Sequence, residues 1–157
     1  MKFLTSSDKI ALYCRDEEIS YRSLIGWTAS LARQHGAGPK ERVVICAENQ
    51  PGWVAAFYSA WRTQSIPVPV DVTATVDEIA YVIKDCQPSA IFTSKAVVPN
   101  LQAAAAKAGC DVRVIILEDH PAPATITPGD DDFPDNPMDD IAVIIYTSGT
   151  TGSPKGV

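Results

Sequence analysis

A chain of 157 residues is long enough for one domain with a real core and too short for two large ones. Its 13 Lys and Arg against 19 Asp and Glu give a formal net charge of −6, which argues against a nucleic-acid-binding surface. No run approaches the roughly 18 apolar residues of a membrane-spanning helix, and residues 1–8 contain no long apolar stretch for export. We therefore expect a cytoplasmic protein with no transmembrane segment, and leave peripheral attachment to a membrane open.

Hydrophobic periodicity divides the first part of the chain into alternating strands and helices. Residues 10–13 have the pattern of a short strand, and Ile19 either begins a second strand or leads directly into a helix. Ser20 is placed as the N-cap of that helix, and Gly36 ends it as a C-cap glycine. A buried strand over 42–47 precedes a second helix. The aromatic side chains of that helix recur at helical spacing and should pack in the core: Trp53, Phe57 and Trp61, with Ala60.

The middle of the chain continues the alternation. Residues 66–70 predict a third strand, which Pro67 and Pro69 should confine to a sheet edge or make irregular, because each removes a ladder donor. Thr75 and Glu78 are placed as the capping box of the next helix. The other predicted elements are a strand over 90–93, a helix over 97–108, a strand over 112–117 and a buried strand over 141–146.

Strands that alternate with helices in this way predict βαβ units. The expected fold class is α/β with a mainly parallel sheet and right-handed crossovers. In open sheets of this kind, ligands bind outside the carboxyl ends of the strands. No internal repeat is evident in the sequence.

Residues 118–140 break the alternation. This segment is acidic and rich in proline, so we expect a long surface loop without regular structure. Asp130, Asp131 and Asp132 could be metal ligands, but a solvated loop tip is the favoured interpretation.

The cysteines are spaced far apart along the chain, at positions 14, 46, 86 and 110. They include no C-x-x-C pair, and neither histidine lies at ligand spacing from them, so a metal site is disfavoured. Disulfides are an alternative, but buried free thiols are favoured for a chain of this character.

The last stretch carries the strongest signal for chemistry, because a loop of glycines, hydroxyls and one lysine follows the predicted strand 141–146. Gly149, Gly152 and Gly156 allow positive φ and close backbone approach to a ligand. Successive backbone N–H groups in such a loop bind anions, and Lys155 adds a positive charge suited to phosphate. The spacing departs from the common P-loop pattern. On composition alone, a flexible tail is the alternative to a nucleotide-phosphate cradle.

The order of residues in this loop is more specific than its composition. Residues 146–157, Tyr-Thr-Ser-Gly-Thr-Thr-Gly-Ser-Pro-Lys-Gly-Val, resemble the signature phosphate loop of the adenylate-forming (AMP-dependent synthetase/ligase) superfamily. Upstream segments at 19–24, 41–53, 68–71 and 79–85 also resemble that family, and its long-chain fatty-acid–CoA ligases in particular. Family members are several times longer than this chain. By resemblance, residues 1–157 are a partial N-terminal α/β domain, in which 141–157 are a strand followed by the phosphate-binding loop.

The resemblance implies an acyl-CoA synthetase that joins a carboxylic acid, favoured as a fatty acid, to ATP and then passes the acyl group to CoA. The residues implied in contact with the β- and γ-phosphates are Thr147, Ser148, Gly149, Thr150, Thr151, Gly152 and Lys155. Mg²⁺ would lie beside Thr150. The CoA site, the acyl pocket and the catalytic lysine would lie in the missing C-terminal part, so no catalytic residue is assigned and this chain alone should be inactive.

Two further expectations complete the sequence-based interpretation. A partial domain should expose apolar surface, so self-association is expected. The alternative to an enzyme is a naturally short, non-catalytic module that binds nucleotide or serves in assembly.

Overall fold

The computed structural model describes residues 3–136, 141–147 and 155–157. Within these residues, the centre is a parallel sheet of four strands in the order β4-β3-β5-β6. The strands are β3 (Arg42–Cys46), β4 (Ile66–Pro69), β5 (Ala90–Thr93) and β6 (Arg113–Ile116). The predicted α/β fold with a parallel sheet is therefore confirmed.

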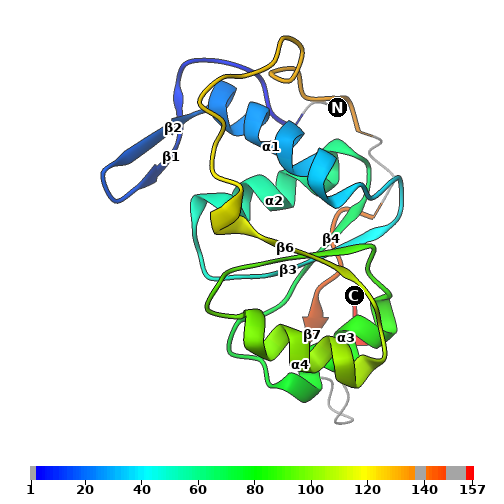
Figure 1. Cartoon of the computed structure of the whole chain (residues 1–157). Coiled ribbons are helices and arrows are strands. Elements are labelled where there is room, and N and C mark those ends of the chain that lie inside the picture. Colours follow the sequence, from blue (N-terminus) through cyan, green and yellow to red (C-terminus); the bar gives the residue numbers. More distant parts are fainter. Residues whose placement is uncertain (1–2, 137–140, 148–154) are drawn as a thin grey trace.

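Two pairs of helices enclose this sheet, one pair on each face (Figure 1). The pairs are α1 (Tyr21–His35) with α2 (Pro51–Arg62), and α3 (Val76–Cys86) with α4 (Val98–Ala108). Val43 and Ile45 of β3 belong to the apolar cluster with α1 and α2, whereas Val44 and Cys46 belong to the cluster with α3 and α4. A strand buried on both faces is typical of parallel sheets and explains the continuous apolar run in the sequence.

An antiparallel hairpin precedes α1 and projects from the body of the molecule (Figure 1). Its strands are β1 (Ile10–Cys14) and β2 (Glu17–Ser20). Ile19 pairs with Leu12 in the hairpin, so it lies in a second strand and does not lead directly into the helix.

The capping signals in the sequence act as predicted. Ser20 Oγ accepts a hydrogen bond from Ser23 N at 3.1 Å, and Gly36 follows α1 in the left-handed region with φ of 63°. Thr75 Oγ1 accepts from Glu78 N, while the Glu78 carboxylate accepts from Thr75 N at 2.8 Å. These contacts satisfy backbone groups that a helix end leaves unpaired.

The strand β4 lies at an edge of the sheet, as its prolines predicted. Ile66 and Val70 donate their backbone N–H groups to the carbonyls of Glu41 and Ile45, on the side of β3. Because successive residues of a strand alternate, Pro67 and Pro69 face the open edge, where each lacks an N–H group.

The predicted buried strand over 141–146 is wrong in this structure. Only β7 (Tyr146–Thr147) is a strand there, and the side chains of Ile141 and Ile145 are 62% and 50% exposed. Ile144 N donates to Pro67 O at 3.1 Å, but the prolines of β4 offer no donor in return. A continuous ladder with β4 is therefore not available to this segment.

The segment that follows β6 is irregular, as predicted, apart from a short 3₁₀ helix, η1 (Leu117–Asp119), at its start. Most of it is exposed, as expected of a surface loop, but it also runs across α1 and packs on the α1–α2 side of the molecule (Figure 1). Trp27 Nε1 donates to His120 O at 2.8 Å, and Phe133 is only 1% exposed. Asn136 Nδ2 donates to Trp61 O at 2.8 Å. The last residues of the predicted loop, 137–140, lie outside the described part of the chain.

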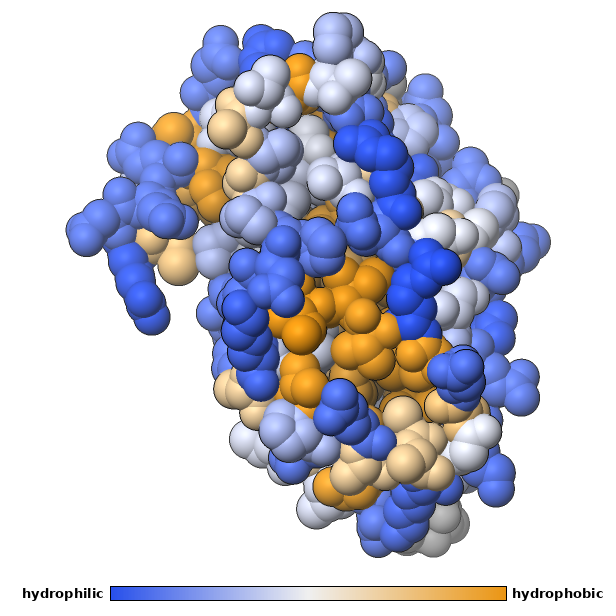
Figure 2. All heavy atoms as spheres, in the orientation of Figure 1, coloured by the Kyte–Doolittle hydropathy of each residue, from blue (hydrophilic) through white to orange (hydrophobic). Residues whose placement is uncertain are grey.

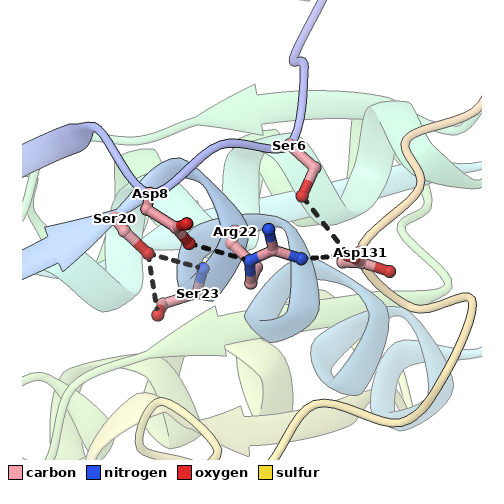
Figure 3. Close-up of polar contacts among 6 residues, drawn as sticks. All are labelled: Ser6, Asp8, Ser20, Arg22, Ser23 and Asp131. Carbon is pink, nitrogen blue, oxygen red and sulfur yellow. Dashed lines mark hydrogen bonds and ion pairs between the residues drawn. The ribbon is translucent and has the colours of Figure 1, made fainter.

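Two aspartates of this segment, Asp130 and Asp131, are ion-pair partners of α1, which corrects the prediction of a solvated tip for these two residues, whereas Asp132 is exposed. Arg22 lies between Asp8 and Asp131, with Nε 2.9 Å from the first carboxylate and Nη1 2.8 Å from the second (Figure 3). Ser6 Oγ donates to the same oxygen of Asp131 at 3.4 Å. The N-terminal segment, α1 and the segment after β6 are thus joined at one arginine.

All four cysteines are free thiols, and Cys46 and Cys86 are buried, as predicted. Cys14 and Cys110 are only partly buried. The aromatic side chains of α2 pack against the core as predicted, but none of Trp53, Phe57 and Trp61 is fully buried.

Apolar side chains also reach the surface over β6 and the adjoining part of α4 (Figure 2). β6 is the second edge of the sheet, and Val114 in it is 37% exposed. The expectation of self-association stays a prediction. Among the described residues, no helix has the length and apolar character needed to cross a membrane.

Candidate phosphate-binding site

The two ends of the glycine-rich loop lie side by side. β7 (Tyr146–Thr147) pairs antiparallel with β8 (Lys155–Gly156), so that Thr147 lies opposite Lys155 and Tyr146 opposite Gly156. Ile145 and Val157 extend the pair, with N···O distances of 2.9 and 3.0 Å in the two directions. The loop therefore starts and ends on one short β-ribbon.

Of the seven residues assigned to phosphate contact, Thr147 and Lys155 are described, and both are exposed at the loop's base. Ser148, Gly149, Thr150, Thr151 and Gly152 lie outside the described residues, and so does the Mg²⁺ position beside Thr150. Within the described part of the chain, no carboxylate forms an ion pair with Lys155. An exposed ammonium at the loop's base fits a phosphate ligand.

The ribbon is fastened to α3 by Tyr146. Its hydroxyl donates to Asp85 Oδ2 at 2.5 Å, and its ring meets Tyr81 edge-on with centroids 6.5 Å apart. Burial, together with the hydrogen bond to Asp85, raises the pKa of Tyr146 above its usual value. The phenol therefore stays protonated and remains a donor at neutral pH.

Gly156 is a glycine for reasons of space. A Cβ there would lie 3.0 Å from Ile144 Cγ2 and 3.2 Å from Tyr146 Cζ, closer than ordinary van der Waals contact. Its φ is not positive, so the conformational freedom that glycine allows is not used at this position. Close packing under the tyrosine ring is the property that the position requires.

A cavity of about 350 Å³ opens beside the base of the loop. It lies where β4 ends and α3 begins, and is lined by Pro69, Val70, Asp71, Thr73, Ala74, Glu78, Val82, Tyr146 and Thr147. The loop is thus placed at the carboxyl end of a parallel strand, where ligands bind in such sheets.

The two carboxylates in the cavity wall are held by local hydrogen bonds. Backbone and hydroxyl hydrogen bonds from Thr73 lower the pKa of Asp71, and those from Thr75 lower the pKa of Glu78. Both side chains are therefore anionic at neutral pH. A triphosphate would be repelled from this wall, which favours its approach from the side of Lys155.

A second hollow, of about 510 Å³, lies between the hairpin and η1. Its rim carries Glu17, Glu18 and Glu118, and its floor includes Trp27 and Leu117. The described residues that line this hollow include these three carboxylates and no lysine or arginine, so the hollow does not suit a phosphate. The glycine-rich loop remains the better candidate site.

A family model described as "AMP-binding enzyme" matches residues 4–157, which is nearly the whole chain. The chain belongs to the AMP-binding enzyme family. The superfamily inferred from the phosphate-loop signature is thereby confirmed.

Relatives with known names include a peptide synthase. The chain is 32% identical over 156 residues to a dimodular nonribosomal peptide synthase of Bacillus subtilis, a match that covers 96% of this chain and 6% of that protein. It is 30% identical over 152 residues to tyrocidine synthase 3 of Brevibacillus parabrevis, a match that covers 94% of this chain and 2% of that protein. The chain thus spans a small part of the length of these relatives.

Solved structures show the same fold. The O-succinylbenzoate coenzyme A synthetase MenE of Bacillus subtilis, in complex with AMP, has a TM-score of 0.75 at 21% identity; the match covers 96% of this chain and 38% of that one. ATP-bound MatB of Rhodopseudomonas palustris also has a TM-score of 0.75, at 27% identity, and the match covers 98% of this chain and 32% of that one. None of these four relatives is named as a long-chain fatty-acid ligase, so the finer assignment made from the sequence is not supported.

The sequence-based reasoning missed the residues that hold the loop in place. The sequence placed Asp85 only in a segment that resembles the family, with no role in the site. It described Gly156 as a glycine that allows positive φ and close approach to a ligand, and not as one that packs under a tyrosine. One signal was available, because Tyr81 and Asp85 lie four residues apart and hence on one face of α3. Nothing in the sequence pairs that face with Tyr146.

Proposed function

We propose that this chain provides the nucleotide-phosphate site of an adenylate-forming ligase that activates a carboxylic acid with ATP. A carboxylate oxygen would attack the α-phosphorus, and pyrophosphate would leave as the α–β bridging bond breaks. The single observation that carries the proposal is the paired base of the glycine-rich loop, with Lys155 exposed beside Thr147 at the carboxyl end of β4.

The chain's own groups would act on the leaving pyrophosphate. Lys155 would neutralise charge that develops on the β- and γ-phosphates, and loop N–H groups would fix their orientation. Holding the phosphates in place also orients the α-phosphorus for attack. Mg²⁺, when bound with ATP, would supply further charge neutralisation beside Thr150.

The acid and the acyl acceptor are a finer part of the proposal. The resemblance of the upstream segments favours a fatty acid, with CoA as acceptor. The named relatives include both a coenzyme A synthetase and a peptide synthase, and so support the adenylate-forming step more than either acceptor. The free thiols support a cytoplasmic location.

Substitution of Lys155 tests the site. In the complete natural polypeptide, we expect Lys155→Ala to weaken Mg²⁺–ATP binding about tenfold, the size of one charge-assisted contact. Lys84→Ala is the matched control, because Lys84 is an exposed lysine on α3 that forms no ion pair within the described residues. Calorimetry measures binding, and acid-dependent ATP–pyrophosphate exchange measures the chemical step. Equal affinities for wild type and Lys155→Ala would reject the assignment of the site.

The second candidate function is a nucleotide-binding module without catalysis. For residues 1–157 on their own, we expect Mg²⁺–ATP binding and no acyl-adenylate. The reason is that the chain spans only 38% and 32% of the two solved structures compared above. If the complete polypeptide also binds ATP but shows no exchange with any carboxylic acid offered, the module is the better description.

A further inference from the structure

We propose that Tyr146 and Asp85 are positioning residues, and that their hydrogen bond fixes the base of the glycine-rich loop to α3 in the geometry that receives the nucleotide phosphates. This inference rests on the proposed function. It assigns a role to a contact between segments 61 residues apart in the sequence.

The contact is short and involves an ionisable acceptor. At 2.5 Å between the tyrosine oxygen and the Asp85 carboxylate, it falls in the range of charge-assisted O–H···O⁻ bonds, which are stronger than bonds between neutral groups. Tyr81, one helical turn before Asp85, supports the same ring from the side. Tyr146 is thus held at two points of one helix face.

The helix that provides these two points is itself anchored. Ile79 and Ile83 of α3 are fully buried, and Val82 is 4% exposed. The capping box of Thr75 and Glu78 fixes its first turn. A side chain fastened to α3 is therefore fastened to the core of the domain, and a site supported by a rigid element keeps its geometry better than one supported by a loop.

The same tyrosine also holds the second arm of the loop. Besides Ile144, a Cβ at Gly156 would meet Tyr146 Cζ at 3.2 Å and the Tyr146 hydroxyl at 3.4 Å, and both atoms are at the end of the phenol that reaches Asp85. The hydroxyl end of Tyr146 therefore covers Gly156 and binds Asp85 at once. If the bond to Asp85 is lost, the ring is held less firmly over Gly156, and both arms of the ribbon lose this one of their contacts with α3.

The proposed phosphate ligands lie one residue away from this contact on both arms. Thr147 follows Tyr146 and Lys155 precedes Gly156, and the two lie opposite each other in the ribbon. A rotation of the ribbon about its base would displace both groups together. Displacements of about 1 Å in positioning groups cost up to about 100-fold in rate, so the Tyr146–Asp85 bond should affect ATP affinity and turnover.

Four single variants separate this role from a general effect on folding. Tyr146→Phe removes the hydroxyl and keeps the ring over Gly156, and Asp85→Ala removes the acceptor. Asp85→Asn keeps an oxygen that can accept from the phenol. Tyr81→Phe is the matched control for loss of a hydroxyl, because no hydrogen bond of the Tyr81 hydroxyl is found within the described residues.

The experiment measures Mg²⁺–ATP affinity by calorimetry, and KM for ATP and kcat by acid-dependent ATP–pyrophosphate exchange, in the complete natural polypeptide. We expect Tyr146→Phe and Asp85→Ala each to raise Kd and KM for ATP about tenfold, with melting temperatures near that of the wild type. The double variant that combines Tyr146→Phe with Asp85→Ala should have Kd and KM values for ATP no higher than those of either single variant, because both substitutions remove the same hydrogen bond. Asp85→Asn keeps an acceptor but loses its charge, so it should be impaired less than Asp85→Ala, and Tyr81→Phe should stay near wild type.

The outcomes are decisive in either direction. If Tyr146→Phe and Asp85→Ala bind ATP as wild type does, or if Tyr81→Phe is equally impaired, the positioning role is overturned. If wild type itself binds no ATP, the proposed function fails first. Amide exchange then tests the contact alone: Ile144 and Ile145 should exchange about tenfold faster in Tyr146→Phe than in Tyr81→Phe if the bond fixes the ribbon, and equally fast if it does not.

Discussion

The guanidinium of Arg33 faces the carboxylate of Asp130 with two parallel contacts. Nη1 lies 3.1 Å from one carboxylate oxygen and Nη2 lies 3.0 Å from the other. This fork geometry is the strongest form of the pair, and here it links α1 to a segment 97 residues later in the chain. With Arg22 and Asp131, it explains why the acidic segment lies along α1.

We expect Asp130→Ala to lower the free energy of unfolding by at most about 1 kcal/mol at low salt, because Arg33 is 59% exposed and solvent screens the pair. The loss should shrink as the salt concentration rises. Urea titrations at two ionic strengths measure it, with Asp111→Ala as the control at an exposed aspartate that forms no ion pair within the described residues. An equal effect of both substitutions would contradict a specific contribution of the pair.

Phe133 gives this segment its apolar anchor. Its side chain is 1% exposed and meets the Tyr58 ring edge-on with centroids 6.3 Å apart. We expect Phe133→Ala to lower the free energy of unfolding by about 3–5 kcal/mol, through lost burial and the cavity left behind. Tyr13→Ala, at a side chain 74% exposed, should change it by less than about 0.5 kcal/mol. Chemical denaturation of both variants checks the contrast, and a small effect of Phe133→Ala would mean that the segment is loosely packed.

His35 should make stability depend on pH. Ala37 N donates to its Nδ1 at 2.9 Å, so the proton of the neutral ring is on Nε2, which faces Ser59 O at 3.3 Å. Burial lowers the pKa of His35 below its ordinary value, and the Arg113 charge acts in the same direction, whereas Ser59 and Glu41 oppose it. Protonation of the ring would add a proton at Nδ1, and the hydrogen bond from Ala37 N to that atom would then be lost.

Because the pKa of His35 is lower in the folded than in the unfolded chain, the unfolded chain binds more protons below a pH of about 6.5. The free energy of unfolding should therefore fall as the pH drops from about 6.5 toward the folded-state pKa, by at most about 1.4 kcal/mol per pH unit. Urea titrations between about pH 7.5 and about pH 5 should show that the free energy of unfolding depends less steeply on pH in His35→Gln than in wild type. His120→Gln is the control, and it should behave as wild type does.

The cysteines should divide into two classes of reactivity. Burial, with the charges of Asp71 and Glu48, raises the pKa of Cys46 to about 11, and burial raises that of Cys86 to about 12. Since the thiolate is the nucleophile, both should resist alkylation near pH 8. Cys14 and Cys110 are partly exposed and should be labelled first. Peptide mapping after iodoacetamide treatment of the folded and the urea-unfolded chain measures this; rapid labelling of Cys46 in the folded chain would contradict it.

Local patterns in the sequence were sufficient for the framework of the fold. Hydrophobic periodicity located α1 to α4 and the four strands of the parallel sheet, since each element must bury one face or both. Ser20, Gly36 and the pair Thr75–Glu78 marked helix ends, because capping is decided within a few residues. The order of residues 146–157 was enough to indicate the family.

Only the tertiary structure decided how distant segments combine. The 141–146 run has the composition of a buried strand, yet the open edge of β4 presents prolines to it. Asp130 has the local character of a solvated residue, but Arg33 meets it from a distant part of the chain. Tyr146 and Asp85 likewise meet only when the chain has folded. The physical reason is the same in each case: periodicity and capping are properties of neighbours in sequence, whereas an edge, an ion pair or the support of a loop depends on which segments the fold brings together.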